Sequence, residues 1–376
     1  MKNGWQRKKI GDFCEVIAGQ SPEGKFYNSE GNGMPFYQGK KDFGEKYIES
    51  PTTWTTQTTK VARKGDILMS VRAPVGPVNF SVGEICIGRG LAAIRPKAEL
   101  NQDFLFYQLL YLQPEIAGRE GAVFPTINKS EIESLPISFV PLPEQHRIVR
   151  ILDQAFDGIA TAKSNAEKNI LNARALFDRY QQYVFTQGGE GWTYAKLGEL
   201  CEVIAGQSPE GKFYNSEGNG MPFYQGKKGF GEKFIGAPTA WTTQITKIGR
   251  KGDILMSVRA PVGPVNFSTE EICIGRGLAA IRSNNDLNCD FLFYQLLYLQ
   301  PKIAGKEGAV FASINKSEIE TLPILFAPLP EQQQVVADLD AFNHEIQHLK
   351  SIYQQKIAAL SELKETLLHS AFNGEL

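Results

Sequence analysis

Two long stretches of the chain carry a helical pattern of hydrophobic positions and almost no glycine or proline. In residues 143–187 the apolar positions alternate by four and three residues, at Ile148, Leu152, Ala155, Ile159, Ala162, Ala166, then polar Asn169, then Ala173, Leu176, Tyr180 and Tyr183. Residues 330–376 repeat this spacing at Val335, Leu339, Phe342, Ile346, Leu349, Tyr353, then Lys356, then Leu360, Leu363 and Leu367. Heptad spacing of this kind predicts two helices of about 40 residues, each about 60 Å long, whose apolar stripes pack against each other.

The segments that precede these stretches contain short hydrophobic runs bounded by turn residues. Residues 65–72 and 78–81 alternate as strands do, and a Pro/Gly break at 73–77 separates them. The threonine-rich run 52–63 has the pattern of an exposed edge strand. A helix is predicted over 103–118, with Pro114 expected to end or kink it. These segments therefore predict globular domains of mixed α and β structure.

The chain repeats itself at an offset of 187 residues. Identical sequences occur at 14–41 and 201–228, at 63–81 and 250–268, and at 84–95 and 271–282. A period this long indicates a duplicated domain and not a solenoid, whose units are about 20–50 residues. We expect globular domains at 1–142 and 188–329, long helices at 143–187 and 330–376, and a pseudo-two-fold relation between the copies.

Composition narrows the class of protein. The chain has 376 residues and 42% hydrophobic residues, so both domains can bury a core. Its net charge of −1 argues against a sequence-indifferent polyanion binder but does not exclude specific DNA binding. No signal peptide or membrane-spanning stretch is recognisable, so we expect a cytoplasmic protein. Five cysteines without a C-x-x-C pair argue against a disulfide framework or a zinc site. Residues 330–376 are acidic and suit a protein partner better than a phosphate.

Catalytic motifs are weak. An adenine methyltransferase would need an N-P-P-Y-type tetrapeptide, and the sequence has none. Gly88-Arg89-Gly90 with Ala93 fits G-x-G-x-x-A, but Pro96 follows too soon for the helix that a dinucleotide site requires. Asp12, Glu23 and Lys25 could suggest a nuclease, but the E-x-K lies in a glycine-rich loop and the second copy replaces Asp12 with Glu199. No catalytic, cofactor-binding or metal-binding residue is therefore predicted.

Four motifs carry a family resemblance: PLPEQ at 141–145 and again at 328–332, LKETLLHSAFNGEL at 363–376, and the blocks KGDILMSVRAPVG and IGRGLAAIR in each copy. With them, the whole chain resembles the DNA-specificity (S) subunit of type I restriction-modification enzymes. The resemblance implies an α+β protein with two target-recognition domains, joined by two helices that form an antiparallel coiled coil. Each domain would read one half of a split site in double-stranded DNA.

The resemblance also implies partners. Methylation and cleavage would belong to modification subunits, two in number, and to restriction subunits, which would bind the methyl donor, ATP and Mg²⁺. The recognition domains of this family usually differ, whereas here they are nearly identical, so the site is expected to be palindromic. A complex that only methylates is an alternative, as are a protein-interaction scaffold without a DNA role and a self-contained enzyme.

Candidate DNA-binding residues lie mainly in the glycine-rich loop that opens each copy. Gln and Asn suit adenine, Lys and Arg suit guanine, and Ser, Tyr and Lys also bind phosphates. In the first copy the candidates are Gln20, Ser21, Lys25, Tyr27, Asn28, Gln38, Lys40, Lys41, Arg72 and Arg89. Their equivalents are Gln207, Ser208, Lys212, Tyr214, Asn215, Gln225, Lys227, Lys228, Arg259 and Arg276. A solvated surface loop is the alternative interpretation.

The polar break in the heptad pattern occurs at Asn169 and Lys356, which are 187 residues apart. A polar residue at a seam position of a coiled coil fixes the register at some cost in stability. We expect these two residues to set the register of the helix pair.

Overall fold

Both heptad stretches are helical in the computed structural model, which describes residues 4–117, 126–305 and 313–376. They form α4 (Leu142–Gln187) and α8 (Leu329–Phe372). The chain divides into two units: unit 1 comprises residues 1–167 and 354–376, and unit 2 comprises residues 168–353. Each unit thus contains one globular domain and a part of both long helices. No helix of the described residues is long and apolar enough to cross a membrane.

The globular domain of unit 1 is built mainly from short strands. In chain order its elements are β1 (Gln6–Lys9), α1 (Ile10–Phe13), β2 (Cys14–Ala18), η1 (Gly24–Phe26), β3 (Tyr27–Asn28), β4 (Met34–Tyr37), η2 (Lys40–Asp42), β5 (Trp54–Thr55), β6 (Val61–Ala62), β7 (Ile67–Ser70), β8 (Val78–Phe80), β9 (Ile85–Ile87), β10 (Leu91–Pro96), α2 (Gln102–Ala117), α3 (Lys129–Ser134) and β11 (Pro136–Phe139).

Two larger sheets and a two-stranded ribbon organise these strands. One sheet has the antiparallel order β2-β10-β7-β8, with Ala92 of β10 opposite Ala18 of β2 and Met69 of β7. The other has the order β3-β5-β4-β9-β6 and contains a parallel pair, β4 with β9. The ribbon pairs β1 with β11, which leads directly into α4. The sheet topology therefore places the ends of distant segments side by side.

The domain of unit 2 repeats this plan with the same strand orders. Its elements are β12 (Thr193–Lys196), α5 (Leu197–Leu200), β13 (Cys201–Ala205), η3 (Gly211–Phe213), β14 (Tyr214–Asn215), β15 (Met221–Tyr224), η4 (Lys227–Gly229), β16 (Trp241–Thr242), β17 (Ile248–Gly249), β18 (Ile254–Ser257), β19 (Val265–Phe267), β20 (Ile272–Ile274), β21 (Leu278–Ser283), α6 (Cys289–Ile303), α7 (Lys316–Glu320) and β22 (Pro323–Phe326).

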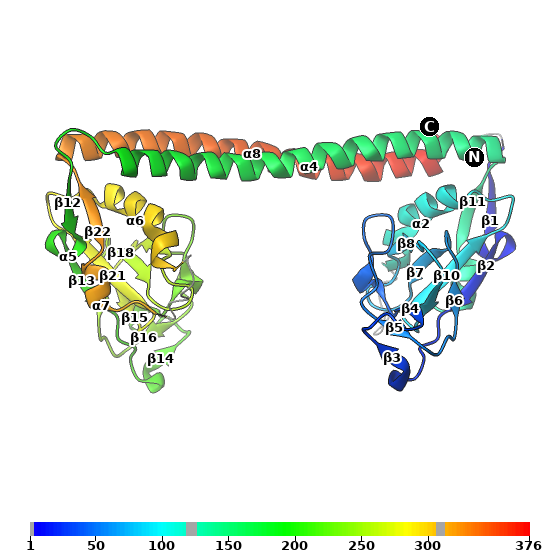
Figure 1. The fold of residues 1–376 in the computed structure, drawn as a ribbon, viewed down its shortest axis with the longest axis horizontal. Helices are drawn as coiled ribbons and strands as arrows, with labels where there is room; N and C mark the ends of the chain where they lie inside the picture. Colours follow the sequence, from blue (N-terminus) through cyan, green and yellow to red (C-terminus); the bar gives the residue numbers. More distant parts are fainter. Residues whose placement is uncertain (1–3, 118–125, 306–312) are drawn as a thin grey trace. The chain divides into compact units, whose positions relative to one another are not determined.

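The core of each unit joins its globular domain to the long helices. In unit 1, α2 lies between the sheets and the α4/α8 pair (Figure 1). Phe104 of α2 is fully buried and contacts Phe372 of α8 edge to face at 5.3 Å between ring centroids. Leu152 of α4 belongs to the same hydrophobic cluster. The apolar stripes of the helices therefore pack on the domain as well as on each other.

The two long helices run antiparallel within each unit. In unit 1 the Arg147 guanidinium near the start of α4 donates to the backbone oxygen of Leu376 at 2.8 Å, and Lys364 lies over the Phe156 ring. In unit 2, Tyr180 near the end of α4 contacts Phe342 near the start of α8, with ring centroids 5.0 Å apart. The predicted pairing of the two helices is confirmed in both units.

The predicted seam is wrong in parts of both helices. Ile148 and Ala173 are buried as expected, but Leu176 and Tyr183 of α4 and Leu349 and Leu363 of α8 are exposed. After Ala173 the buried side moves to Phe177, which packs against the second domain. In this segment the helix also packs against the core of the second domain. A four-residue step from Ala173 to Phe177 therefore replaces the three-residue step of the strict heptad.

Asn169 is half-buried, whereas Lys356 is exposed and its neighbour Ile357 takes the less exposed position. Their role in the register stays a prediction.

Two local predictions, the edge strand over 52–63 and the helix over 103–118, differ in part from the structure. The run 52–63 does not form one edge strand but two two-residue strands, β5 and β6, in the same sheet. The helix predicted over 103–118 is observed as α2, and it continues past Pro114 because Ile116 still packs in the core; Gly118 lies outside the described residues. Trp5 and Trp192 are partly buried and pack against the hydrophobic cores of unit 1 and unit 2.

The glutamine of PLPEQ explains why this motif opens each long helix. Gln145 is fully buried: its side-chain oxygen accepts from the Asn101 amide at 2.6 Å, and its side-chain nitrogen donates to the carbonyls of Glu99 and Val140. Gln332 makes the same three bonds in unit 2. One side chain thus ties the first turn of the long helix to the start of α2 or α6.

Replacing Gln145 with alanine is expected to lower the free energy of unfolding of unit 1 by about 2–4 kcal/mol, because three backbone groups lose their partner. Gln332→Ala should act equally on unit 2. Gln154 is exposed on the same helix, so Gln154→Ala should change stability by less than about 0.5 kcal/mol. Denaturant unfolding of the three variants provides the comparison, and equal midpoints for Gln145→Ala and Gln154→Ala would contradict the expected role.

Candidate nucleic-acid interface

The turn Gly88-Arg89-Gly90 connects the two sheets of the first domain, since β9 belongs to one sheet and β10 to the other. Both glycines are needed for close packing. A Cβ on Gly90 would lie 2.2 Å from the carbonyl oxygen of Gln38, and one on Gly88 would lie 3.0 Å from the Phe36 ring. Both glycines are buried while Arg89 between them is exposed. The local sequence therefore presents one arginine from a tightly packed backbone.

Several predicted DNA-binding residues meet at this turn. The amide of Arg89 donates to Ser21 Oγ at 3.2 Å, and the amide of Gln20 donates to the carbonyl of Ile87 at 2.9 Å. Val71, which precedes Arg72, donates its amide to the carbonyl of Gly90 at 2.9 Å. Residues from four separate strand ends are thus held around one point. We call Gln20, Ser21, Gln38, Lys40, Arg72 and Arg89 the junction cluster.

The second domain has the same cluster. Its members are Gln207, Ser208, Gln225, Lys227, Arg259 and Arg276, and the Arg276 amide donates to Ser208 Oγ at 3.1 Å. A shallow hollow of about 130 Å³ is lined by Gln225, Gly226, Lys227, Ser257, Arg259, Ala260, Arg276 and Gly277. Polar and cationic side chains therefore converge on a concave surface.

The cations of this cluster are available to a ligand. Lys40, Arg72 and Arg89 are exposed, and none of them forms an ion pair within residues 4–117, 126–305 and 313–376. Gln38 is exposed beside them. An exposed arginine can bind guanine or phosphate, and an exposed glutamine can bind adenine, so this set can contact both bases and backbone.

Other predicted residues lie elsewhere in the domain. Lys25, Tyr27 and Asn28 belong to η1 and β3, at the end of the domain far from the helices (Figure 1). Tyr27 Oη donates to the carbonyl of Pro22, and the Asn28 side chain holds the backbone of Asn32. Lys212, Tyr214 and Asn215 are arranged in the same way in the second domain. These side chains already have partners in their own loop.

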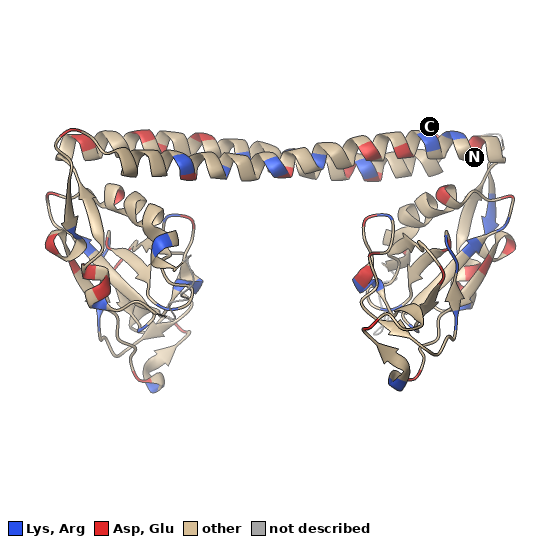
Figure 2. Ribbon diagram, in the orientation of Figure 1, with Lys and Arg blue, Asp and Glu red and all other residues tan. Residues whose placement is uncertain are grey.

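Lys41 and Lys228 are exposed in η2 and η4, next to the junction cluster and beside a position at which the two copies differ. The first copy has Asp42 where the second has Gly229, and Glu49 where the second has Gly236. In each unit basic and acidic residues are interspersed over the domain and the helices (Figure 2). Local clusters, and not the charge of a whole face, therefore define the cationic surface.

The structure gives no support to the catalytic motifs. Gly88-Arg89-Gly90 leads into β10 and not into a helix, so it is no dinucleotide loop. Glu23 pairs with Lys25 at 2.6 Å within one loop. No group of three or more His, Cys, Asp or Glu residues suited to a metal ion occurs among the described residues. Burial raises the pKa of Cys14 and of Cys201 to about 12, so neither thiol is activated.

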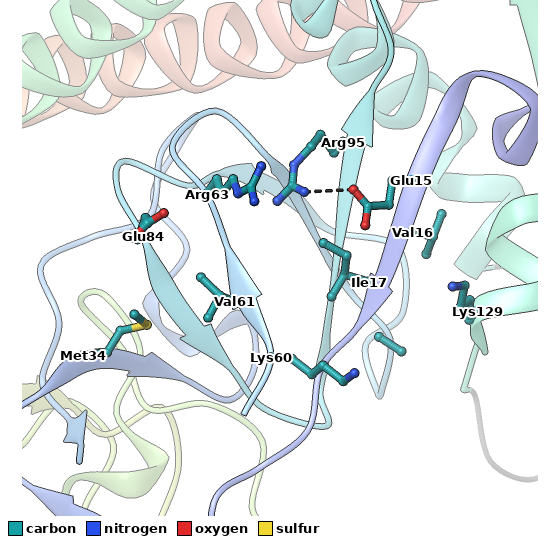
Figure 3. A pocket seen from close by; sticks show the side chains of 11 residues that line it. Glu15, Val16, Ile17, Met34, Lys60, Val61, Arg63, Glu84, Arg95 and Lys129 are labelled. Atoms are coloured by element: carbon teal, nitrogen blue, oxygen red, sulfur yellow. Dashed lines mark hydrogen bonds and ion pairs between the residues drawn. The ribbon is translucent and has the colours of Figure 1, made fainter. Parts of the chain in front are cut away.

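A larger hollow of about 610 Å³ lies in the first domain and was not predicted from the sequence (Figure 3). Lys60, Arg63 and Lys129 line it together with Arg95, whose guanidinium binds Glu15 at 2.9 Å and buried Asp66 at 2.7 Å. The hydrogen bond to Asp66 is the main reason that the pKa of Arg95 is raised. Arg95 therefore bridges strands of the four-stranded sheet to the turn before β7, and no spacing in the sequence signals this contact.

One model of a known protein family matches the chain in two places. The model of the type I restriction modification DNA specificity domain matches residues 2–172 and 189–356. Among curated proteins, a putative type I restriction enzyme specificity subunit of Methanocaldococcus jannaschii is 29% identical, over 99% of this chain and 93% of that protein. A second specificity subunit of the same organism is 25% identical over the same shares.

Solved structures agree with these matches. A chain from a study of complex assembly and conformational transition of a type I restriction-modification system aligns with a TM-score of 0.86 and 28% identity, over 100% of this chain and 99% of that one. The HsdS subunit from Thermoanaerobacter tengcongensis aligns with a TM-score of 0.62 and 28% identity, over 100% of this chain and 98% of that one. The similarity thus covers both globular domains and both long helices.

Proposed function

Because the chain belongs to the family of type I restriction-modification DNA specificity subunits, we propose that its two junction clusters each bind one half of a split site in double-stranded DNA. Such a subunit is not itself catalytic and supplies DNA recognition within an enzyme complex. The duplication of one exposed Gln-Lys-Arg cluster in both domains is the observation that carries the proposal.

The near-identity of the domains favours a site with two equivalent halves. Residues 84–95 and 271–282, which contain Arg89 and Arg276, are identical, as are the loops that contain Gln38 and Gln225. Equal surfaces read equal base sequences, so an inverted repeat follows if the domains face opposite strands. The substitutions at Asp42 and Glu49 would change the charge beside one half only.

The exposed sides of α4 and α8 suit protein partners. Leu171, Leu176 and Leu363 are 68%, 54% and 46% exposed on these helices, although each is apolar. Exposed apolar side chains on a helix can be buried by a partner protein, and they mark a binding surface where they form a contiguous patch. We infer that modification subunits, two in number, dock here, and that restriction subunits join the complex. Methyl donor, ATP and Mg²⁺ would be bound by these partners.

Selection of duplexes from a random-sequence library with the full chain tests the proposal. We expect a motif of two equivalent, inverted half-sites, and an affinity for it that falls steeply with salt as phosphate contacts release counterions. Arg89→Ala and Arg276→Ala should each weaken binding of the selected duplex about tenfold or more.

Lys64 and Lys251 provide the matched control. Each precedes β7 or β18, at the opposite end of the strand from Arg72 or Arg259, and Lys64 and Lys251 are exposed. Lys64→Ala and Lys251→Ala should leave the selected motif unchanged. If the chain enriched no duplex motif, or if its binding did not depend on salt, the interaction scaffold would be the better interpretation.

A further inference from the structure

In each domain, a lysine that follows the candidate DNA-binding loop in the chain contacts a long helix. Lys46 Nζ lies 3.1 Å from Asp103 Oδ1 of α2 and 3.1 Å from Asp153 Oδ1 of α4. Tyr107 of α2 donates its hydroxyl to the same oxygen of Asp153. In unit 2, Lys233 Nζ lies 2.8 Å from Asp290 of α6 and 3.3 Å from Asp340 of α8. The arrangement is therefore present twice, with equivalent residues.

The ammonium group is held tightly. The Lys46 side chain is only 29% exposed, and its Nζ also lies over the Tyr107 ring, 5.3 Å from the centroid. Burial alone would lower the pKa of Lys46, but Tyr107, Asp153 and Asp103 outweigh it and raise the pKa above its usual value. The lysine is charged at every physiological pH, so the contact does not switch off through titration.

Backbone hydrogen bonds connect the segment around Lys46 to the segment that contains Lys40 of the junction cluster. The carbonyl of Lys46 accepts from the Phe80 amide of β8 at 2.9 Å. Residues 42–49 form a small hairpin, closed where the Glu49 amide donates to the carbonyl of Asp42 at 2.9 Å. Asp42 is the last residue of η2, which contains Lys40 and Lys41. A continuous set of contacts thus leads from the long helix through the hairpin to Lys40 and Lys41 of η2.

We propose that Lys46 and Lys233 are positioning residues for DNA recognition. Each fixes the loop of its own domain that carries two exposed lysines, Lys40 and Lys41 or Lys227 and Lys228, relative to the long helix. This proposal rests on the function proposed above. Neither lysine needs to touch DNA for this role. In each unit, the contacts of this lysine would then connect the helix proposed to bind partner proteins to the loop proposed to bind DNA.

Substitution of one lysine at a time tests this role. With Lys46→Met, one half of the duplex motif selected by the full chain should become degenerate while the other half stays defined. Binding of the duplex selected by the unchanged chain should weaken about tenfold, the range of one or two lost base contacts. Lys233→Met should have the same effect on one half, and the double variant should lose definition in both halves. Lys64→Met, which removes an equal charge at an exposed position, should select the original motif.

Asp153→Asn distinguishes a positioning role of Lys46 from a direct effect of its charge on DNA. If Lys46 acted only through its charge on DNA, removal of a nearby carboxylate would leave binding unchanged or strengthen it. Positioning predicts that Asp153→Asn weakens binding and relaxes the same half, and that its effect is not additive with that of Lys46→Met. Thermal unfolding of each variant identifies loss of folding, and Asp340→Asn with Lys233→Met repeats the test in the other unit.

The outcomes are distinct. An unchanged motif and affinity for folded Lys46→Met and Asp153→Asn chains would overturn the positioning role while leaving the proposed function intact. Failure of the unchanged chain to select any motif would overturn the proposed function itself. Equal relaxation of both halves by Lys46→Met alone would also overturn the proposal, because the contacts of Lys46 lie within unit 1.

Discussion

Replacing Phe372 with alanine is expected to destabilise unit 1 by about 3–5 kcal/mol while leaving unit 2 folded, since the variant opens a cavity among buried aromatic rings. Phe372 is 4% exposed, and its ring lies 5.3 Å from Phe104 and 5.6 Å from Tyr111 between centroids. A loss of this size is a large fraction of the 5–15 kcal/mol typical of a domain. Hydrogen exchange should therefore report faster exchange in α2, residues 102–117, than in α6.

Phe185 is the matched position in the other unit. It is 3% exposed and contacts Phe291 and Tyr298 with ring centroids 5.5 and 5.8 Å away. Phe185→Ala should reverse the pattern, so that α6 loses protection and α2 keeps it. If both variants weakened both units equally, the division of the chain into units with separate cores would be incorrect.

Insertion of four residues after Ala166 is expected to lengthen the gap between the two DNA half-sites. Four helical residues add about 6 Å of rise, close to two base pairs of B-DNA at about 3.4 Å each. The insertion lies beside Glu167 and Lys168, where the first unit ends and the second begins within α4. It also turns the following helix by about 40° and offsets the heptad seam, which local unwinding of the helix pair can absorb.

Methylome sequencing of a host with the partner subunits measures the effect. The half-site sequences should stay the same and only their separation should grow. A second variant with a further four-residue insertion after Tyr353 of α8 lengthens both helices by the same amount and serves as the comparison. An unchanged gap would show that the helices do not set the spacing, and new half-site sequences would show that the recognition residues lie elsewhere.

The long helices were predicted well from the sequence, because glycine-poor segments with heptad spacing form amphipathic helices whose apolar stripe must be buried away from water. It failed where two neighbouring apolar residues competed for one buried position. Leu176 continues the heptad, yet Phe177 is the residue that packs, since its ring contacts Tyr294 of α6 as well as Phe342 of α8. The choice depends on a domain surface that periodicity within the helix does not describe.

The candidate site was predictable in residue type but not in arrangement. Gln38, Arg72 and Arg89 are far apart in the chain, and only the sheet topology brings their strand ends together. Tyr27 and Asn28 belong to types equally suited to DNA, but their hydrogen bonds hold their own loop. Lys46 gave no signal, and Gln145 was noticed only as part of the PLPEQ motif, because a lysine or glutamine in a sequence does not show which distant groups it binds.

The discontinuous composition of unit 1 has a consequence for the order in which the protein acquires structure during synthesis. Unit 2 consists of consecutive residues, 168–353, whereas unit 1 needs residues 354–376, which follow all of them. On the ribosome, the second domain can thus complete its core first. The first domain is made earlier, but α2 must wait for Leu368, Ala371 and Phe372 before its apolar surface is covered. Until then part of that surface stays exposed in the nascent chain, where it can aggregate or bind chaperones.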